Sequence, residues 1–144
     1  MELLILNESL LKEMKADVCR CLPDEACGLI GGRGEQGRMV LPVSNTLQGG
    51  TRFYMDPQGL VEAILKIESA GMEVVGIYHS HPRGPAVPSA TDVQEHTWHE
   101  AVTLIWSPEE NGWQVRAFLI GDHDWREIML CVDQDATFLA GEGC

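Results

Sequence analysis

The feature that most constrains the fold is the segment 73–81, EVVGIYHSH, which is apolar over most of its length and ends in two histidines. A continuous apolar run of this length is typical of a strand whose two faces are both covered. Residues two apart on a strand point to the same face, so His79 and His81 are expected on one side and Ser80 on the other. The sequence therefore predicts a central strand that ends with two imidazoles on one face.

The remaining pattern predicts a single α/β domain, a mixed β-sheet with helices on its faces. Helical spacing begins at Ser9 and is stopped by Pro23, a second helix follows Asp56 as N-cap and closes at Gly71, and a third starts at Ser89. The other predicted strands are 3–6, 27–32, 38–43, 51–55, 101–106, 113–121 and 125–132. A chain of 144 residues suffices for one domain, which we place at 1–132, followed by a loosely ordered tail at 133–144.

Charge and composition limit the partners. The 22 acidic and 10 basic side chains give a formal net charge of −12, whereas a nucleic-acid surface needs a basic patch, so no nucleic-acid partner is expected. No stretch approaches the roughly 20 apolar residues of a membrane span, and the start lacks the basic leader of a secretory signal. We therefore predict a cytoplasmic protein without a membrane partner, and the sequence indicates no particular oligomeric state.

Asp92 lies three residues after Ser89, in the first turn of the third predicted helix. A strand end that faces a helix start can aim two imidazoles and a carboxylate at one point. Such a set, with ligand distances of about 2.0–2.2 Å, suits Zn²⁺ and leaves its fourth position for water. The structural alternative is a capping box, in which Ser89 caps the helix and Asp92 reaches back. The two interpretations are compatible, because Asp92 can serve both.

The whole stretch 79–92, HSHPRGPAVPSATD, resembles the zinc motif of the JAMM metalloproteases, which are JAB/MPN domains with an intact metal site. That family also has a glutamate just before an apolar strand, and PDEACG at 23–28 supplies Glu25 in this context. The resemblance covers roughly residues 1–131 and is of the compact prokaryotic type. It implies the JAB/MPN architecture, which is related to that of cytidine deaminases, although the metal motif of the zinc deaminases is absent from the sequence.

The resemblance also implies roles and a reaction. His79, His81 and Asp92 would ligate Zn²⁺. Glu25 would take a proton from the activated water and pass it to the leaving amine, and Ser89 would donate a hydrogen bond to the oxyanion. The implied activity is zinc-dependent hydrolysis of an isopeptide or peptide bond at the C-terminal glycine of a ubiquitin-like (β-grasp) protein, which frees that protein from lysine. The alternative is processing of a sulfur-carrier protein C-terminus, by removal of a cysteine adduct or a precursor tail. A non-catalytic MPN scaffold is disfavoured, because all five positions are present.

Other segments carry weaker predictions. The segment 51–55 is a candidate edge strand for an extended Gly-Gly tail of the substrate. The loop 83–88 could line the leaving-group side, with Arg83 either contacting substrate or simply solvated. His96 and His99 are predicted on one face of the third helix, in an order that matches no helical zinc motif.

Overall fold

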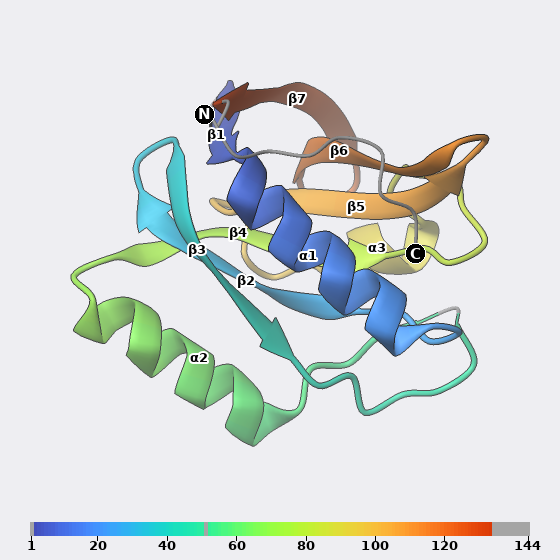
Figure 1. The fold of residues 1–144 in the computed structure, drawn as a ribbon, viewed down its shortest axis with the longest axis horizontal. Coiled ribbons are helices and arrows are strands. Elements are labelled where there is room, and N and C mark those ends of the chain that lie inside the picture. The colour runs from blue at the N-terminus through green and yellow to red at the C-terminus, as the bar shows by residue number, and fades with distance from the viewer. Residues whose placement is uncertain (1, 51, 134–144) are drawn as a thin grey trace.

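The protein is described by a computed structural model that covers residues 2–50 and 52–133, so the predicted tail lies outside the described residues except for Asp133. Figure 1 shows its elements. In chain order they are β1 (Leu3–Asn7), α1 (Glu8–Cys21), β2 (Cys27–Arg33), β3 (Gln36–Val43), α2 (Pro57–Ser69), β4 (Glu73–Ser80), α3 (Ala90–Glu95), β5 (Val102–Glu109), β6 (Gly112–Ile120) and β7 (Trp125–Asp133).

The strands form one mixed sheet that closes on itself in the order β1-β3-β2-β4-β5-β6-β7. Strand β1 runs parallel to β3 and β7, and β4 runs parallel to β5, while the other neighbours are antiparallel. Strand β4 lies between β2 and β5, so the predicted central position of the histidine-bearing strand is confirmed. The closure was not predicted, because it depends on pairing between the first and last strands, which no local pattern reports.

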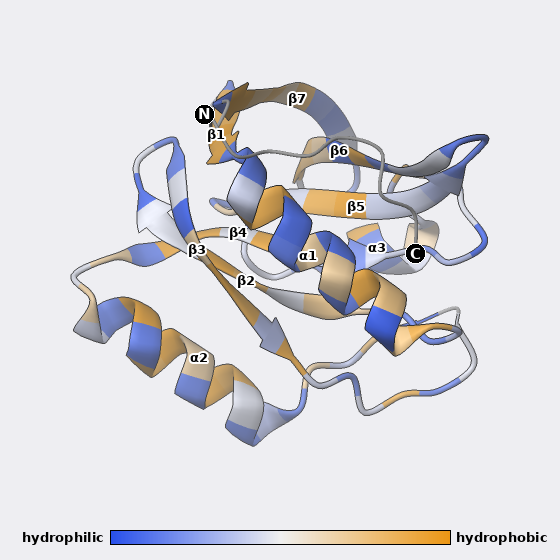
Figure 2. Cartoon of the chain, viewed as in Figure 1, coloured by the Kyte–Doolittle hydropathy of each residue, from blue (hydrophilic) through white to orange (hydrophobic). Residues whose placement is uncertain are grey.

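The helices cover the two faces of the sheet, and the strands that they cover are strongly apolar (Figures 1 and 2). Helix α1 begins at its N-cap Asn7, whose side chain accepts a hydrogen bond from the Leu10 N–H at 2.8 Å. Tyr78 of β4 belongs to the cluster beneath α1, and Ile77 packs against the cluster beneath α2. Because neighbouring residues of β4 are covered on opposite faces, its apolar run needs no polar alternation.

Two local predictions are wrong. The segment 52–54 forms no strand, and only an isolated bridge joins Asn45 to Met55. Gly49 and Gly50 turn the chain before this segment with φ angles of 110° and 78°. The Asn45 side chain binds the Tyr54 N–H and the Arg52 carbonyl, and the Thr46 N–H donates to the Tyr54 carbonyl. The third helix ends at Glu95, so His96 and His99 do not lie on it.

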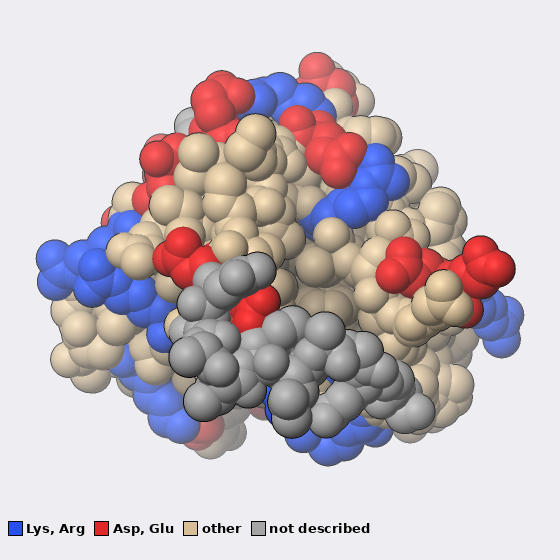
Figure 3. Space-filling model, turned by 45° about the horizontal axis from the view of Figure 1, so that its top comes forward, with Lys and Arg blue, Asp and Glu red and all other residues tan. Residues whose placement is uncertain are grey.

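The outer surface carries charges of both signs. On the face drawn in Figure 3, acidic and basic side chains lie close to one another. Elsewhere on the protein, two ion pairs are bidentate, from Arg116 to Glu127 and from Arg126 to Glu2. Within residues 2–50 and 52–133, no helix is long and apolar enough to cross a membrane.

Candidate metal centre

Glu25 lies beside the histidines at the end of β4, although 54 positions separate it from His79 in the sequence. Cys27, the first residue of β2, pairs with His79 in the antiparallel ladder. Ser80, which is fully buried, accepts a hydrogen bond from the Ala26 N–H at 2.8 Å through its Oγ, and its own N–H donates to the Ala26 carbonyl at 3.1 Å. These contacts fix the turn before β2 against the strand end, so that ligand atoms of Glu25, His79 and His81 all lie within 4.8 Å of one another.

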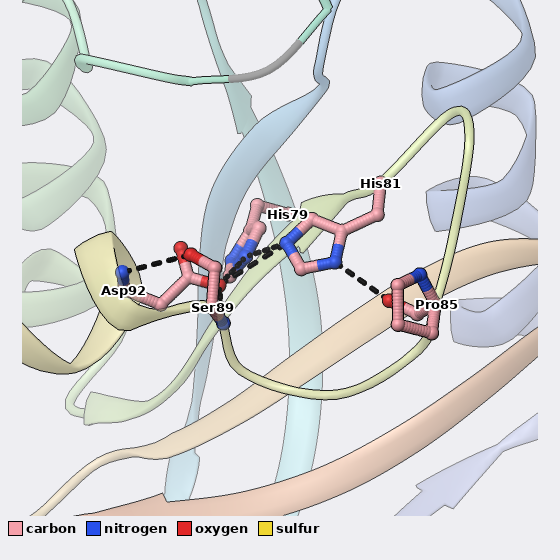
Figure 4. Close-up of polar contacts among 5 residues, drawn as sticks. All are labelled: His79, His81, Pro85, Ser89 and Asp92. Atoms are coloured by element: carbon pink, nitrogen blue, oxygen red, sulfur yellow. Dashed lines mark hydrogen bonds and ion pairs between the residues drawn. The ribbon is translucent and has the colours of Figure 1, made fainter.

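The start of α3 supplies the second half of the centre. Ser89 caps the helix by accepting a hydrogen bond from the Asp92 N–H at 3.0 Å, and Asp92 Oδ2 accepts one from the Ser89 N–H at 2.9 Å. This capping box confirms the structural interpretation of the sequence. The same Oδ2 lies 3.2 Å from His79 Nε2 and 3.1 Å from His81 Nε2 (Figure 4). The cap therefore aims the carboxylate at the two rings.

The three atoms form a nearly equilateral triangle, because His79 Nε2 and His81 Nε2 are 3.1 Å apart. Ligands at about 2.0–2.1 Å from a tetrahedral Zn²⁺ are separated by about 3.4 Å, so the set needs little expansion to hold such an ion. His81 Nδ1 lies 2.7 Å from the Pro85 carbonyl and donates to it, which leaves Nε2 of the neutral ring with its lone pair free. Two imidazoles and one carboxylate are also the donor types of catalytic zinc sites. The residues thus fit a divalent metal.

Glu25 and the two histidines also place three possible ligand atoms close together, within 4.8 Å of one another. We favour Asp92 as the third ligand, since its oxygen completes the tighter triangle. Glu25 is only 3% exposed, and its Oε1 has no hydrogen-bond partner within the described part of the chain. Burial raises the pKa of Glu25 to about 7, against the lowering effect of His81. Burial alone would also raise the pKa of Asp92, but its contacts with His79 and His81 hold that pKa well below its usual range.

A groove of about 630 Å³ adjoins the centre and includes His79 and Asp92 in its lining. Most of its other walls are apolar, and they come from the loop before α2, from α2 and β4, and from the segment after α3: Leu47, Phe53, Met55, Leu60, Ile77 and Trp98. The Phe53 ring stacks on the His79 ring, with centroids 4.6 Å apart and an angle of 26° between the planes. Arg52 and Glu95, which also line the groove, form an ion pair at 3.0 Å.

The structure thus brings together all five residues of the predicted site, namely Glu25, His79, His81, Ser89 and Asp92. The other candidates lie elsewhere or contribute differently. Arg83 is exposed in the loop after β4. His96 lines the groove and its Nε2 donates to the Trp98 carbonyl at 2.8 Å, whereas His99 contacts Asp122 at 3.5 Å. Sequence reasoning assigned no role at the site to Phe53 or Asn45, because only the folded loop brings them to the histidines and to Glu25.

Comparison with protein families decides the class of the chain. A model that describes the prokaryotic homologues of the JAB domain matches residues 7–126. The chain belongs to the prokaryotic JAB family. The implied JAB/MPN architecture is confirmed by this match and by the solved relatives of the prokaryotic JAB protein.

Relatives of this prokaryotic JAB protein are named as proteases, desampylases or peptidases. It is 36% identical over 130 residues to a probable TtuB-protein conjugate cleaving protease from Thermus thermophilus, covering 90% of this chain and 82% of the relative. It is 34% identical over 130 residues to a desampylase from Haloferax volcanii, with 88% and 91% covered. A CysO-cysteine peptidase from Mycobacterium tuberculosis is 30% identical over 122 residues, with 83% and 84% covered.

Solved structures agree on the fold. The solution structure of a Desulfitobacterium hafniense protein superposes with a TM-score of 0.83 at 32% identity, and the alignment covers 93% of this chain and 95% of that one. A JAB1/MPN domain protein from Archaeoglobus fulgidus superposes with a TM-score of 0.59 at 21% identity, and the alignment covers 92% of this chain and 100% of that one. At this level of identity, the similarity shows a shared fold only.

Proposed function

We propose that this prokaryotic JAB protein is a zinc metallopeptidase that cleaves the bond after the C-terminal glycine of a ubiquitin-like, β-grasp protein and releases that protein from a lysine amine. The observation that carries the proposal is the convergence of His79 Nε2, His81 Nε2 and Asp92 Oδ2 within 3.2 Å of one another, beside the buried carboxylate of Glu25. The conjugate-cleaving protease of Thermus and the desampylase of Haloferax support this class of substrate.

The proposed metal is Zn²⁺, held by His79, His81 and Asp92. When bound, Zn²⁺ supplies a Lewis acid that lowers the pKa of a water to about 7 and polarises a carbonyl group. The chain prepares these ligands through its own contacts: Pro85 orients the His81 ring, Phe53 covers the His79 ring, and the cap of α3 fixes Asp92. Removal of hydrogen bonds such as those to His81 and Asp92 typically lowers metal affinity by about 10–100-fold.

Glu25 is assigned the proton transfers. Hydrolysis forms a bond from the carbonyl carbon to the water oxygen and breaks the bond to nitrogen, so the water loses a proton and the leaving nitrogen gains one. A single carboxylate beside the metal ligands can take the first proton and deliver the second. Burial raises the pKa of Glu25 to about 7, so both of its protonation states are accessible near neutral pH. A cation bound at the neighbouring ligands would lower that pKa and favour the base form before attack.

Ser89 is assigned to the carbonyl oxygen. Its Oγ already accepts a hydrogen bond from the Asp92 N–H, so the hydroxyl hydrogen remains available to donate elsewhere. A donor aimed at the oxygen on which negative charge develops stabilises the transition state more than the ground state. The position of Ser89 at the cap keeps this hydroxyl beside Asp92 and hence beside the metal ligands.

A second candidate function has its own support in the relatives. The similarity to a CysO-cysteine peptidase favours removal of a cysteine, or of a precursor tail, from the C-terminus of a sulfur-carrier protein. The same five residues would perform that reaction, since only the leaving amine differs. We also propose that the protein acts in the cytoplasm.

The test is a panel of β-grasp proteins offered to the zinc-loaded protein as lysine-linked conjugates, as linear fusions and as C-terminal cysteine adducts. Mass spectrometry of the products identifies the bond that is cut, and Glu25→Gln serves as the control. Release of the β-grasp protein with an intact terminal glycine from lysine supports the first function. Cleavage of the cysteine adduct alone replaces it with the second, and no cleavage of any member overturns both.

A further inference from the structure

We propose that Asn45 is a positioning residue for this reaction. Its side chain joins the main chain of Glu25 and the groove wall at 52–54 into one hydrogen-bonded unit. The inference rests on the proposed function, because it assigns Asn45 a role in that chemistry. Asn45 lies in the loop between β3 and α2 and is not part of the predicted motif.

The hydrogen bonds of the Asn45 amide carry the argument. Its Nδ2 donates to the Glu25 carbonyl at 3.0 Å and to the Arg52 carbonyl at 3.2 Å. Its Oδ1 accepts from the Leu47 N–H and the Tyr54 N–H, both at 2.9 Å. A primary amide offers two N–H donors and an oxygen with two lone pairs, so every hydrogen-bonding position of this side chain is used. A side chain bound in this way has one orientation and ties together segments that are far apart in sequence.

The position of the Glu25 carboxylate depends on this tie. The carboxylate is buried, and its Oε1 finds no hydrogen-bond partner in the part of the chain that is described. Its place beside the metal ligands is therefore set by the main chain that carries it. Contacts on several sides hold that main chain. Ser80 binds Ala26 on the β4 side, the Asp24 N–H donates to the Cys21 carbonyl at 2.9 Å, and Asn45 binds the Glu25 carbonyl itself on the loop side. Without Asn45, the hydrogen bond made directly to the Glu25 main chain is lost.

The same side chain holds the wall of the groove. Arg52 and Tyr54, which Asn45 binds, flank Phe53, whose ring stacks on the His79 ring. The Thr46 N–H donates to the Tyr54 carbonyl at 2.9 Å, which extends the pairing next to Asn45. Asn45 therefore fixes both the proton-transferring residue and the ring that covers a metal ligand. Groups held in this way gain rate from orientation, and a displacement of about 1 Å can cost about 100-fold.

Two variants separate the bonds. Asn45→Ala removes all four, whereas Asn45→Asp keeps an oxygen facing Leu47 and Tyr54 and loses both donors to the carbonyls. We expect both variants to bind about one zinc ion per chain and to lose about 10–100-fold in kcat at saturating substrate. Amide hydrogen exchange at Leu47 and Tyr54 should quicken in Asn45→Ala and stay slow in Asn45→Asp. The matched control is Asn111→Ala, in the exposed turn between β5 and β6, which should match the wild type in every readout.

A purely structural network would change the amide exchange but leave kcat unaltered. A kcat within threefold of the wild type, in zinc-loaded Asn45→Ala, would therefore overturn the inference. If Asn45→Ala does not fold, Asn45→Asp is judged by the same criterion. A wild type that cleaves no member of the panel overturns the proposed function instead. In that case the hydrogen-bond network is judged by amide exchange alone. Unchanged exchange at Leu47 and Tyr54 in folded Asn45→Ala, or in Asn45→Ser if the alanine variant does not fold, overturns the network as well.

Discussion

Replacing Ser89 by alanine should separate its two roles, as cap of α3 and as hydrogen-bond donor to the substrate. The variant removes the Oγ that accepts from the Asp92 N–H at 3.0 Å. It keeps the Ser89 N–H that donates to Asp92 Oδ2 at 2.9 Å, because that contact belongs to the main chain. Asp92 therefore stays oriented toward the histidines, and we expect zinc binding to persist.

The two losses have different sizes. Loss of an N-cap hydrogen bond costs about 1 kcal/mol of stability, which for a chain of 144 residues corresponds to a fall in Tm of about 3 °C. Loss of an oxyanion donor typically lowers kcat by about 10²–10³-fold, or about 2.7–4 kcal/mol of transition-state stabilisation. The effect on rate should thus be far larger than a small loss of folded protein could cause.

The assay combines steady-state cleavage of a β-grasp conjugate, thermal unfolding and zinc content. Ser89→Asp provides a cap acceptor but no hydroxyl hydrogen, so it should recover Tm and remain slow. The control is Asn7→Ala at the cap of α1, where the side chain accepts from the Leu10 N–H at 2.8 Å. It should lose a similar amount of stability and keep its kcat. A Ser89→Ala variant with kcat within threefold of the wild type would refute the assignment.

Two further predictions concern buried groups. In metal-free protein, burial raises the pKa of Glu25 from 4.5 to about 7, so the folded state binds this proton more tightly than the unfolded chain. The free energy of unfolding should then fall as pH rises between these values, by up to about 3 kcal/mol. Urea unfolding in the presence of a chelator, at about pH 5 and pH 8, should show a smaller fall in the free energy of unfolding for Glu25→Gln than for the wild type. Equal falls would show that the pH dependence does not come from Glu25. Tyr78→Phe removes a buried 2.7 Å hydrogen bond to Asp17 and should lower the free energy of unfolding by about 1.5–3 kcal/mol, with kcat unchanged. The control Tyr54→Phe, at an exposed position, should leave stability unaltered. Equal free energies of unfolding for Tyr78→Phe and the wild type would count against the Asp17 contact.

Local sequence patterns predicted the arrangement of the two histidines and the cap that holds Asp92. Period-two geometry on a buried strand put His79 and His81 on one face, and the spacing of Ser89 and Asp92 predicted the capping box that the structure contains. Glu25 could be added only through its resemblance to a family motif, because its approach to the histidines follows from the pairing of β2 with β4. Long-range pairing of this kind leaves no trace in the sequence near Glu25.

The wrong predictions both rest on short patterns. The alternation at 51–55 resembles a strand, yet the Tyr54 N–H donates to the Asn45 side chain and the glycines before it turn the chain. There, contacts with a distant loop residue outweigh the local pattern. The spacing of His96 and His99 suits a helix, but α3 ends at Glu95, and the His96 side chain instead binds the Trp98 carbonyl and lines the groove.

Zinc K-edge X-ray absorption on the zinc-loaded protein tests whether His79, His81 and Asp92 hold the metal, because nitrogen and oxygen ligands differ from sulfur in distance. We expect a nitrogen and oxygen shell at about 2.0–2.1 Å with the multiple-scattering signal of two imidazoles, and loss of that signal in the double variant His79→Ala, His81→Ala. A sulfur shell at about 2.3 Å, which would place the metal on the free thiols of Cys21 or Cys27, would contradict it.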